Sequence, residues 1–310
     1  MLDVRRLRVL REVAVRGSIA AAAEALSFTP SAVSQQLKKL ESETGVQLLR
    51  RTASSVTLTE AGKALVEHTE GILDSLAEAE ADLDRLAGME EPIRLGSITT
   101  AAVTIVPEAL KRYASLRPGA EVRVVEADPL ASLAQLRARE LDLAIVFEYD
   151  HVPLPLDDRL EVVTLLEEPI RAVLPAGHPA ARRRAVRIEE LAEDAWIKAT
   201  SRSSCHEFTA RTCRAAGFEP RIVAEFDDYA AMQNSVAAGV GVAFAPDLGL
   251  TRLAPGVEVR PIAFAPPHRR ILVAARRGQT GEPGIAAMFE ALRATVAARE
   301  PTSPAAVGAG

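Results

Sequence analysis

Apolar residues recur every three or four positions in the first part of the chain, and cap residues separate the runs. Leu7, Leu10 and Val13 share this spacing and predict a first helix, which Gly17 ends because glycine readily adopts the left-handed conformation of a helix terminus. An alanine-rich run at 19–26 predicts a second helix. The chain therefore begins with two short helices, and Ser27 and Phe28 make a tight connection to the next element.

A third helix is predicted over 31–43, and its two faces differ. Thr29 is its N-cap, and Pro30 falls at the first helical position, where a missing N–H leaves no helical bond unmade. One face is apolar, and the opposite face presents Ser31, Ser34, Gln35 and Lys38. Two helices with a short connection, the second polar on its outer face, are typical of a helix-turn-helix. A small helical domain whose polar face only meets water has the same pattern, and this alternative stays open.

Two short strands are predicted next, at 48–51 and 56–58, around a turn at 52–55. Such a hairpin is the wing of a winged helix-turn-helix, and its arginines would contact DNA phosphates. The third helix would enter the major groove, where glutamine pairs with adenine through two hydrogen bonds. The candidate DNA-binding residues are Thr29, Pro30, Ser31, Ser34, Gln35, Lys38, Arg50 and Arg51.

A long helix is predicted from Thr59 to about Ala87, with a seam of apolar and small residues at alternating spacings of four and three. The seam consists of Leu65, Thr69, Ile72, Leu76, Ala79, Leu83 and Leu86. Because a heptad seam is typical of a coiled coil, we expect this helix to pair with the same helix of a second copy. The alternative is a helix that packs on its own domain.

After Gly88 the pattern changes to strands that alternate with helices. The predicted order begins with strand 93–97, helix 101–116, strand 121–126, helix 129–140 and strand 141–147. It continues with strands 162–166 and 170–174, helix 188–192, strand 195–199, helix 205–216, strand 221–225, helix 228–238, strands 241–245 and 270–275, and helix 284–298. This alternation predicts βαβ units on a parallel sheet, and hence an α/β fold. Two consecutive lobes with a cleft between them account for its length.

Charge is distributed unevenly along the chain. Residues 1–65 carry 10 Lys or Arg and 6 Asp or Glu, a net charge of +4, whereas the remainder carries −9. A basic head on an acidic body is typical of a module that binds a polyanion, attached to a module with another task.

The sequence argues against a membrane location and against export. It contains no run of about 18 apolar residues, so no membrane span and no membrane partner are expected. The first 20 residues carry five arginines and no continuous apolar segment, which is unlike a secretory signal. We therefore expect a cytoplasmic protein.

Residues that carry catalysis or hold cofactors do not form a recognisable set. The five histidines are scattered, the two cysteines are too few for a Cys-rich zinc site, and no phosphate-binding glycine loop is present. Gly239 and Gly241 precede a strand but lack the third glycine of a dinucleotide fingerprint. We expect no enzymatic activity, no cofactor and no metal.

An ordered series of motifs in the first 62 residues resembles the LysR-type transcriptional regulators. These motifs are Leu7–Arg16, Gly17–Ile19, Ala21–Leu26, Ser31–Leu37, Leu40–Glu41, Gly45–Arg51 and Leu58–Gly62. Weaker similarities follow at Leu141–Ile145, Gly177–Pro179, Ala216–Pro220 and Val236–Val242. The resemblance therefore covers nearly the whole chain.

The resemblance implies a sequence-specific DNA-binding regulator of transcription that is controlled by a small-molecule effector. It divides the chain into a winged helix-turn-helix domain (1–62), a linker and dimerisation helix (63–88), an effector-binding domain (89–300) and a flexible tail (301–310). The effector-binding domain would have two α/β lobes, as periplasmic binding proteins do. The implied partners are double-stranded DNA, the effector, and further copies of the chain in a homodimer or homotetramer. An interaction with RNA polymerase is also compatible with the resemblance.

Two positions depart from the family pattern. Many members have glutamine where this chain has Pro30, and a proline cannot donate a hydrogen bond to a base edge. Base recognition should therefore depend on the other candidates of the third helix. Leu49 stands where the family usually has phenylalanine, which we interpret as a change in core packing.

The family binds its effector in the cleft, near strand ends and helix N-termini, where unpaired N–H groups suit a carboxylate. Mapped onto this chain, the candidate effector-binding residues are Ser97, Thr99, Thr100, Phe147, Glu148, Thr200, Ser201, Arg202 and Asp227. Arg202 is the one cation in the predicted cleft loops. We therefore expect a small polar effector whose acidic group meets Thr100, Ser201 and Arg202. Each hydroxyl can equally be a helix cap.

Two other functions stay open. Peroxide-sensing members of the family use two cysteines in the stretch that holds Cys205 and Cys213, so thiol-based redox sensing is one. Eight residues of helix rise about 12 Å, more than the roughly 7 Å that a disulfide allows between Cα atoms, so a bond would require local unfolding. The other is a cytoplasmic solute-binding protein. Such a protein would share the two-lobed body, but its function would not require residues 1–65.

Overall fold

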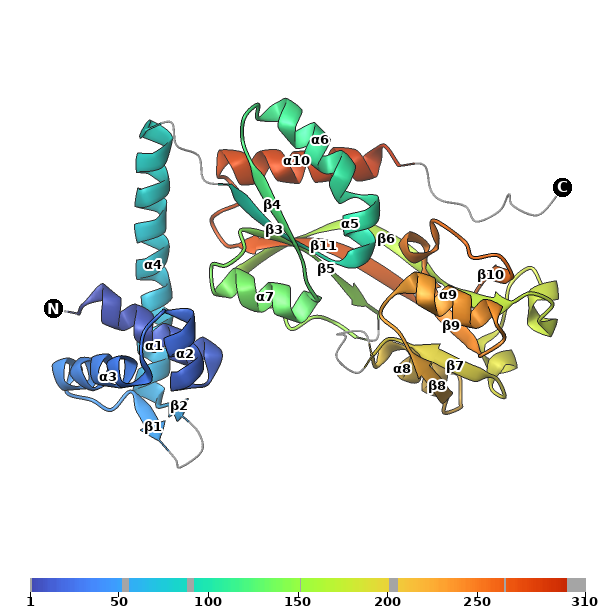
Figure 1. Cartoon of the computed structure of the whole chain (residues 1–310), viewed down its shortest axis with the longest axis horizontal. Coiled ribbons are helices and arrows are strands. Elements are labelled where there is room, and N and C mark those ends of the chain that lie inside the picture. The colour runs from blue at the N-terminus through green and yellow to red at the C-terminus, as the bar shows by residue number, and fades with distance from the viewer. Residues whose placement is uncertain are drawn as a thin grey trace. The chain divides into compact units, whose positions relative to one another are not determined.

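The computed structural model describes residues 2–51, 56–87, 92–150, 152–200, 206–264 and 266–299. Contacts divide the chain between residues 91 and 92 into two compact units, whose helices and strands are labelled in Figure 1. Within the described ranges, every helix is too short or too polar to cross a membrane.

The N-terminal unit contains α1 (Val4–Arg16), α2 (Ile19–Ala25), α3 (Pro30–Thr44), β1 (Leu49–Arg51), β2 (Val56–Leu58) and α4 (Glu60–Ala87). Its helices end where the cap residues predict. Gly17 and Gly45 follow α1 and α3 with φ angles of 66° and 71°, in the left-handed region that glycine tolerates. The Thr29 hydroxyl accepts a hydrogen bond from the Ala32 N–H at 3.2 Å. The unit is a helix-turn-helix followed by an antiparallel hairpin.

One apolar core joins the first three helices to the hairpin. Its buried side chains are Leu7, Val9, Leu10, Val13, Ala22, Ala23, Val33, Leu37, Leu40, Leu48 and Leu49. Glu41 of α3 fixes the hairpin, because its Oε1 accepts from the backbone N–H groups of Leu48 and Leu49 at 2.9 and 3.2 Å. A Cβ on Gly62 would lie 2.1 Å from the Leu48 carbonyl oxygen, so glycine lets the start of α4 pass close to the hairpin.

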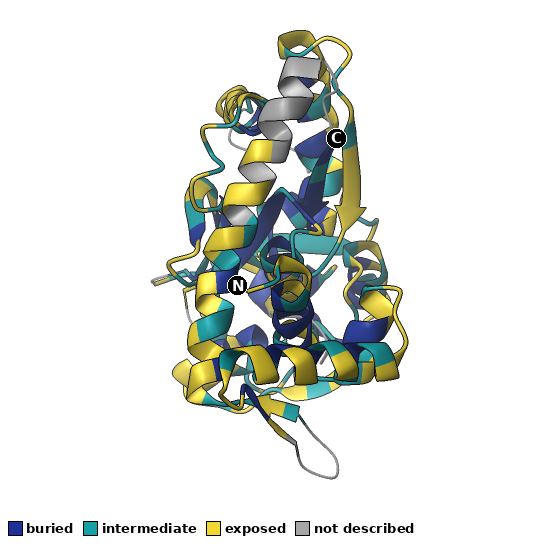
Figure 2. Cartoon of the chain, turned by 90° about the vertical axis from the view of Figure 1, so that its left-hand side faces the viewer, coloured by how far each residue is buried: buried dark blue, intermediate teal, exposed yellow. Residues whose placement is uncertain are grey.

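The predicted seam of α4 changes its surroundings along the helix. Leu65 packs against the core of the unit, and Thr69 is fully buried. Further along, Ile72 and Leu76 are 38% and 43% exposed, and exposed residues appear along the described part of the helix in Figure 2. The side chains of Leu83 and Leu86 lie outside the described residues. Packing against the N-terminal unit therefore accounts for the beginning of the seam, and the middle of the seam is left uncovered by that unit.

The first lobe of the C-terminal unit contains β3 (Ile93–Ser97), α5 (Thr99–Thr104), α6 (Val106–Leu116), β4 (Val122–Glu126), α7 (Pro129–Arg137), β5 (Leu143–Tyr149), β11 (His268–Arg276) and α10 (Pro283–Ala297). The second lobe contains β7 (Ala195–Lys198), α8 (Phe208–Ala215), β8 (Arg221–Glu225), α9 (Tyr229–Ala237), β9 (Val242–Pro246) and β10 (Val257–Pro261), with short 3₁₀ turns at Pro179–Arg182, Ile188–Leu191 and Asp247–Leu250. The long strand β6 (Leu160–Pro175) belongs to both lobes.

The described strands of this unit join in the order β4-β3-β5-β11-β6-β9-β7-β8, and β10 also pairs with β6. The first part of β6 pairs with β11, and its last part pairs with β9 and β10. The chain crosses to the second lobe in β6 and returns before β11, so the second lobe is inserted into the first (Figure 1). The expectation of two consecutive lobes is therefore wrong, and the sheet is mixed rather than all parallel.

Several predicted elements differ in detail. The strands expected at 162–166 and 170–174 are one strand, since Pro169 lies at the end of the ladder with β11 and interrupts no hydrogen bond there. The helix expected at 101–116 breaks at Ile105, because Pro107 has no N–H to continue it. The helix expected at 188–192 is a single 3₁₀ turn, and β10 was not predicted.

Candidate functional site

The exposed face of α3 collects most of the residues predicted to bind DNA. Thr29, Pro30, Ser31, Gln35 and Lys38 are exposed, and Ser34 is half-buried beside them. The opposite face of α3 is buried in the core of the unit. The hydroxyl oxygens of Thr29 and Ser31 lie 2.9 Å apart and share a hydrogen bond. The helix α3 therefore presents a small polar surface at its N-terminal half.

The hairpin places Arg50 at the surface, paired across the ladder with Thr57. Arg51 is paired with Val56, and its side chain lies outside the described residues. Glu41 bonds the hairpin to α3, and the two elements carry exposed hydroxyls, an amide and cations. Such groups bind phosphates and read base edges.

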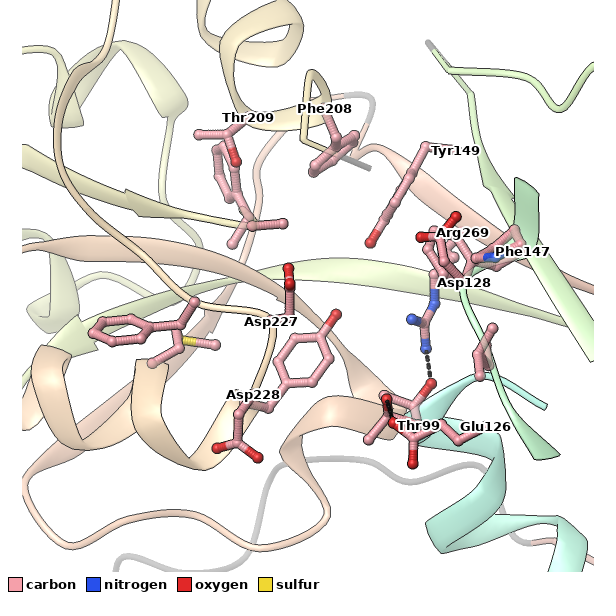
Figure 3. A pocket seen from close by; sticks show the side chains of 18 of the residues that line it. Thr99, Glu126, Asp128, Phe147, Tyr149, Phe208, Thr209, Asp227, Asp228 and Arg269 are labelled. Carbon is pink, nitrogen blue, oxygen red and sulfur yellow. Dashed lines mark hydrogen bonds between the residues drawn. The ribbon is translucent and has the colours of Figure 1, made fainter. Parts of the chain in front are cut away.

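A cavity of about 380 Å³ lies between the two lobes of the C-terminal unit (Figure 3). Strand ends and the helix starts that follow them form its walls. The first lobe contributes Ile98, Thr99, Thr100, Glu126, Ala127, Asp128, Pro129, Phe147, Tyr149 and Arg269, and the second lobe contributes Ala199, Phe208, Thr209, Phe226, Asp227, Asp228, Tyr229, Met232 and Phe244. Residues more than 150 positions apart thus meet at one cavity.

Arg269 is buried in the wall of this cavity, with an exposure of only 1%. Its Nε and Nη2 donate to Glu168 Oε1 at 2.8 and 2.6 Å, and Nη2 also donates to the Thr100 hydroxyl at 3.1 Å. Burial alone would lower the pKa of Arg269, but the charges of Glu168, Tyr229 and Tyr149 and the hydrogen bond to Glu168 together offset this effect and raise it. Glu168 also accepts from the Leu248 N–H at 2.7 Å, so the ion pair links α5 to the 3₁₀ turn of the second lobe.

Among the described residues that line the cavity, four carboxylates stand in two pairs, and Figure 3 shows Glu126 and Asp128 on one side and Asp227 and Asp228 on the other. Asp128 and Asp228 are the N-caps of α7 and α9, accepting from backbone N–H groups at 3.0 and 2.7 Å. Glu126 accepts from the Thr99 hydroxyl at 2.6 Å. Equivalent loops of the two lobes therefore face each other with like charges.

The structure brings together only part of the predicted effector site. Thr99, Thr100, Phe147 and Asp227 line the cavity. Other candidates are engaged elsewhere: Ser97 is buried and donates to the Ile98 carbonyl, and Thr200 donates to Asp227 through its N–H and its hydroxyl. Glu148 alternates away from Phe147 on β5 and pairs with Arg270 at 2.8 Å. Ser201 and Arg202 lie outside the described residues.

Arg269 of β11 is a cation that lines the cavity and was not among the predicted site residues. Sequence reasoning also missed Tyr149, although it follows Phe147 by two positions and so shares its face of the strand. The signal for Arg269 was a charge at the start of the apolar strand 270–275, which is unusual in a buried element. The aromatic residues of the second lobe carried no comparable signal.

Cys213 is buried in α8, where it packs in the core of the unit. Burial, together with the charge of Glu219, raises the pKa of the Cys213 thiol to about 12. A protonated thiol is a poor nucleophile towards peroxide, so this environment does not favour redox sensing. Cys205 lies outside the described residues.

Two family models match the chain in succession. Residues 4–63 match the model described as the bacterial regulatory helix-turn-helix protein, lysR family, and residues 87–297 match the LysR substrate binding domain. The chain belongs to the LysR family. It is a DNA-binding transcriptional regulator with a substrate-binding domain, and the family is not enzymatic.

Individual relatives of this LysR-family regulator are similar over most of its length. The transcriptional dual regulator GltC of Bacillus subtilis is 26% identical over 272 residues, which cover 87% of this chain and 89% of GltC. A full-length OxyR variant from Pseudomonas aeruginosa has a TM-score of 0.65 at 23% identity, over 96% of this chain and 95% of that one. Full-length CbnR complexed with its target DNA has a TM-score of 0.54 at 22% identity, over 95% and 100%. At these identities the solved structures establish the fold alone.

Proposed function

We propose that this LysR-family regulator binds its operator through α3 and the β1–β2 hairpin, and that a small molecule in the cavity between the lobes controls it. The observation that carries the proposal is the cavity itself, because both lobes contribute its walls. Ligand pockets in α/β folds form at the carboxyl ends of strands, and this cavity follows β3, β4, β5, β7 and β8.

Occupancy of the cavity would act on the angle between the lobes. The lobes are joined by β6 and by the chain that returns to β11, so each lobe can move as a body about these two connections. A ligand that touches both walls binds one arrangement more tightly than another and shifts the population towards it. The change in lobe angle is the signal that the regulator would transmit.

The regulator would act as a homodimer or homotetramer through α4. Ile72 and Leu76 are exposed on the predicted seam, and a second α4 would cover them. Two copies would present two α3 helices to two half-sites of an operator. RNA polymerase is a further partner that this mode of action would require for activation.

The test combines operator binding with ligand binding. We expect gel shift with the DNA upstream of the regulator's own gene, and a metabolite screen should find compounds that raise the melting temperature. Ala199→Trp fills the cavity from the second lobe, so it should abolish this rise while leaving operator binding without ligand intact. Ala298→Trp, at the exposed end of α10, is the matched control and should behave as wild type. A ligand-induced rise that survives in Ala199→Trp would place the effector elsewhere.

A further inference from the structure

The charges around the cavity argue against the acidic effector expected from the sequence. Among the described residues that line it are four carboxylates, Glu126, Asp128, Asp227 and Asp228, and one guanidinium, that of Arg269. The carboxylates stand at the entrance in exposed or half-buried positions, whereas Arg269 is deep in the wall. An entering anion would meet negative charge first.

The guanidinium of Arg269 is already engaged. It bonds Glu168 through two nitrogens and Thr100 through one, and its centre lies 5.3 Å from the centre of the Phe147 ring. A ligand carboxylate that replaced Glu168 at Nε and Nη2 would leave Glu168, which is 4% exposed, charged and without its partner. Leaving a buried charge unpaired is costly, so these two nitrogens are poor anchors for an anion.

Aromatic rings form a continuous wall inside the cavity. Tyr149 stacks on Phe208 with ring centres 4.1 Å apart, and Phe208 meets Phe244 edge to face at 6.0 Å. Phe147 meets Tyr149 at 5.5 Å. The faces of aromatic rings carry partial negative charge, and rings combined with carboxylates suit an organic cation.

Thr209 adds an independent polar contact within this wall. The residue is 94% buried by its exposure of 6%, and it lines the cavity beside Phe208. Its hydroxyl has no hydrogen-bond partner among the described residues, and Figure 3 shows the side chain at the cavity. A hydroxyl oxygen has two lone pairs, so this one is available to accept a hydrogen bond from a ligand N–H.

We propose that the cavity takes a small organic cation, whose ammonium or guanidinium group lies among the rim carboxylates and whose apolar body lies against the aromatic wall. This inference rests on the proposed effector role of the cavity and names the chemical class of the effector. The buried Arg269–Glu168 pair is then part of the wall rather than a ligand anchor. Thr209 supplies an additional acceptor for the bound cation.

The test compares three probes of similar size that differ in charge: 2-phenylethylamine, which is protonated at neutral pH, 2-phenylethanol and phenylacetate. Calorimetric titration of the full chain should give an affinity for the amine at least about tenfold above that for either other probe. Phenylacetate or 2-phenylethanol binding as tightly as the amine, or no amine binding, overturns the proposal.

Variants test whether the carboxylates at the rim of the cavity cause the preference for the amine. Asp128→Asn with Asp228→Asn removes two charges and keeps both helix caps, since asparagine caps as well as aspartate. Amine affinity should fall about fivefold, while 2-phenylethanol affinity stays the same. Asp3→Asn, which changes the N-cap of α1 in the other unit, should leave both unchanged.

The same proteins separate this inference from the proposed function. An amine that binds with rim dependence but leaves operator binding unaltered supports the cation site and contradicts control of DNA binding by the cavity. A carboxylate that binds in competition with the amine and alters operator binding overturns the cation site while leaving the effector role intact.

Discussion

Arg50 and Arg269 have the same side chain in opposite circumstances. Arg50 stands exposed on the hairpin, where its charge faces solvent. Arg269 is buried between the lobes, and Glu168 neutralises it at 2.6 Å. The first can bind a polyanion after displacing a few waters and ions, whereas the Nε and Nη2 groups of the second can bind an anion only after losing Glu168. The ligands that a charged side chain can bind therefore depend on the partners that it already has within the protein.

The largest effect should come from breaking the buried pair. Glu168→Gln leaves the Arg269 guanidinium charged and without its counterion, which should lower the free energy of unfolding by about 3–5 kcal/mol. Chemical denaturation of the full chain measures this loss. Adding Arg269→Met removes the stranded charge, so the double variant should recover much of the stability. A single variant as stable as wild type would mean that the pair is open to water and to ligands.

An exposed apolar side chain is likewise free to bind a partner, and Leu76 of α4 provides the test. Leu76→Asp places a carboxylate on the middle of the seam, where Leu76 is 43% exposed within one chain. If a second α4 covers this position, the charge would be buried and unpaired, and dimers should dissociate. Light scattering gives the mass, with Val103→Asp on the exposed surface of α5 as the control. Persistence of the dimer in Leu76→Asp would exclude α4 as the interface.

On the exposed face of α3, Gln35→Ala should change specificity rather than stability. Loss of a bidentate contact should cost about 1–3 kcal/mol at one base position of each half-site and leave other positions unchanged. Binding to a set of single-base operator variants measures this. Uniform weakening across all operators would instead assign Gln35 to the DNA backbone.

The exposed arginine should have a smaller and non-specific effect. Arg50→Ala should weaken binding to every sequence and reduce the salt dependence by about one phosphate contact. Titrations at several salt concentrations give this slope, and the melting temperature should be unaltered because the side chain is exposed. An unchanged slope would remove Arg50 from the DNA-binding surface.

The smallest effect concerns Cys213. Since the pKa of its thiol is raised to about 12 from 9.0, the unfolded chain releases this proton at lower pH than the folded chain. The contribution of the thiol to stability is therefore complete below about pH 9 and is lost as the pH rises towards 12. Alkylation of the folded protein at neutral pH should be slow at Cys213, as peptide mapping would reveal. Rapid alkylation there would revive the redox hypothesis.

From the sequence, the elements of the N-terminal unit could be predicted closely, but the residues of the cavity only in part. Thr29, Pro30 and Gly45 act on their immediate neighbours, so caps and periodicity locate α3 without knowledge of the rest of the chain. The cavity depends on contacts across long separations, such as that of Arg269 with Thr100. Periodicity carries no information on which strand lies beside which, and for that reason neither the insertion of the second lobe nor the role of Arg269 was predicted.

The crossing strand β6 also sets an order of assembly during synthesis. The head is complete once residue 87 has left the ribosome, because its elements are consecutive. The first lobe must wait for β11 and α10, which end at Ala297, although β3, β4 and β5 are complete at Tyr149. A nascent chain can therefore hold a finished DNA-binding surface while its sensor has no cavity, and a truncated product would retain the first and lack the second.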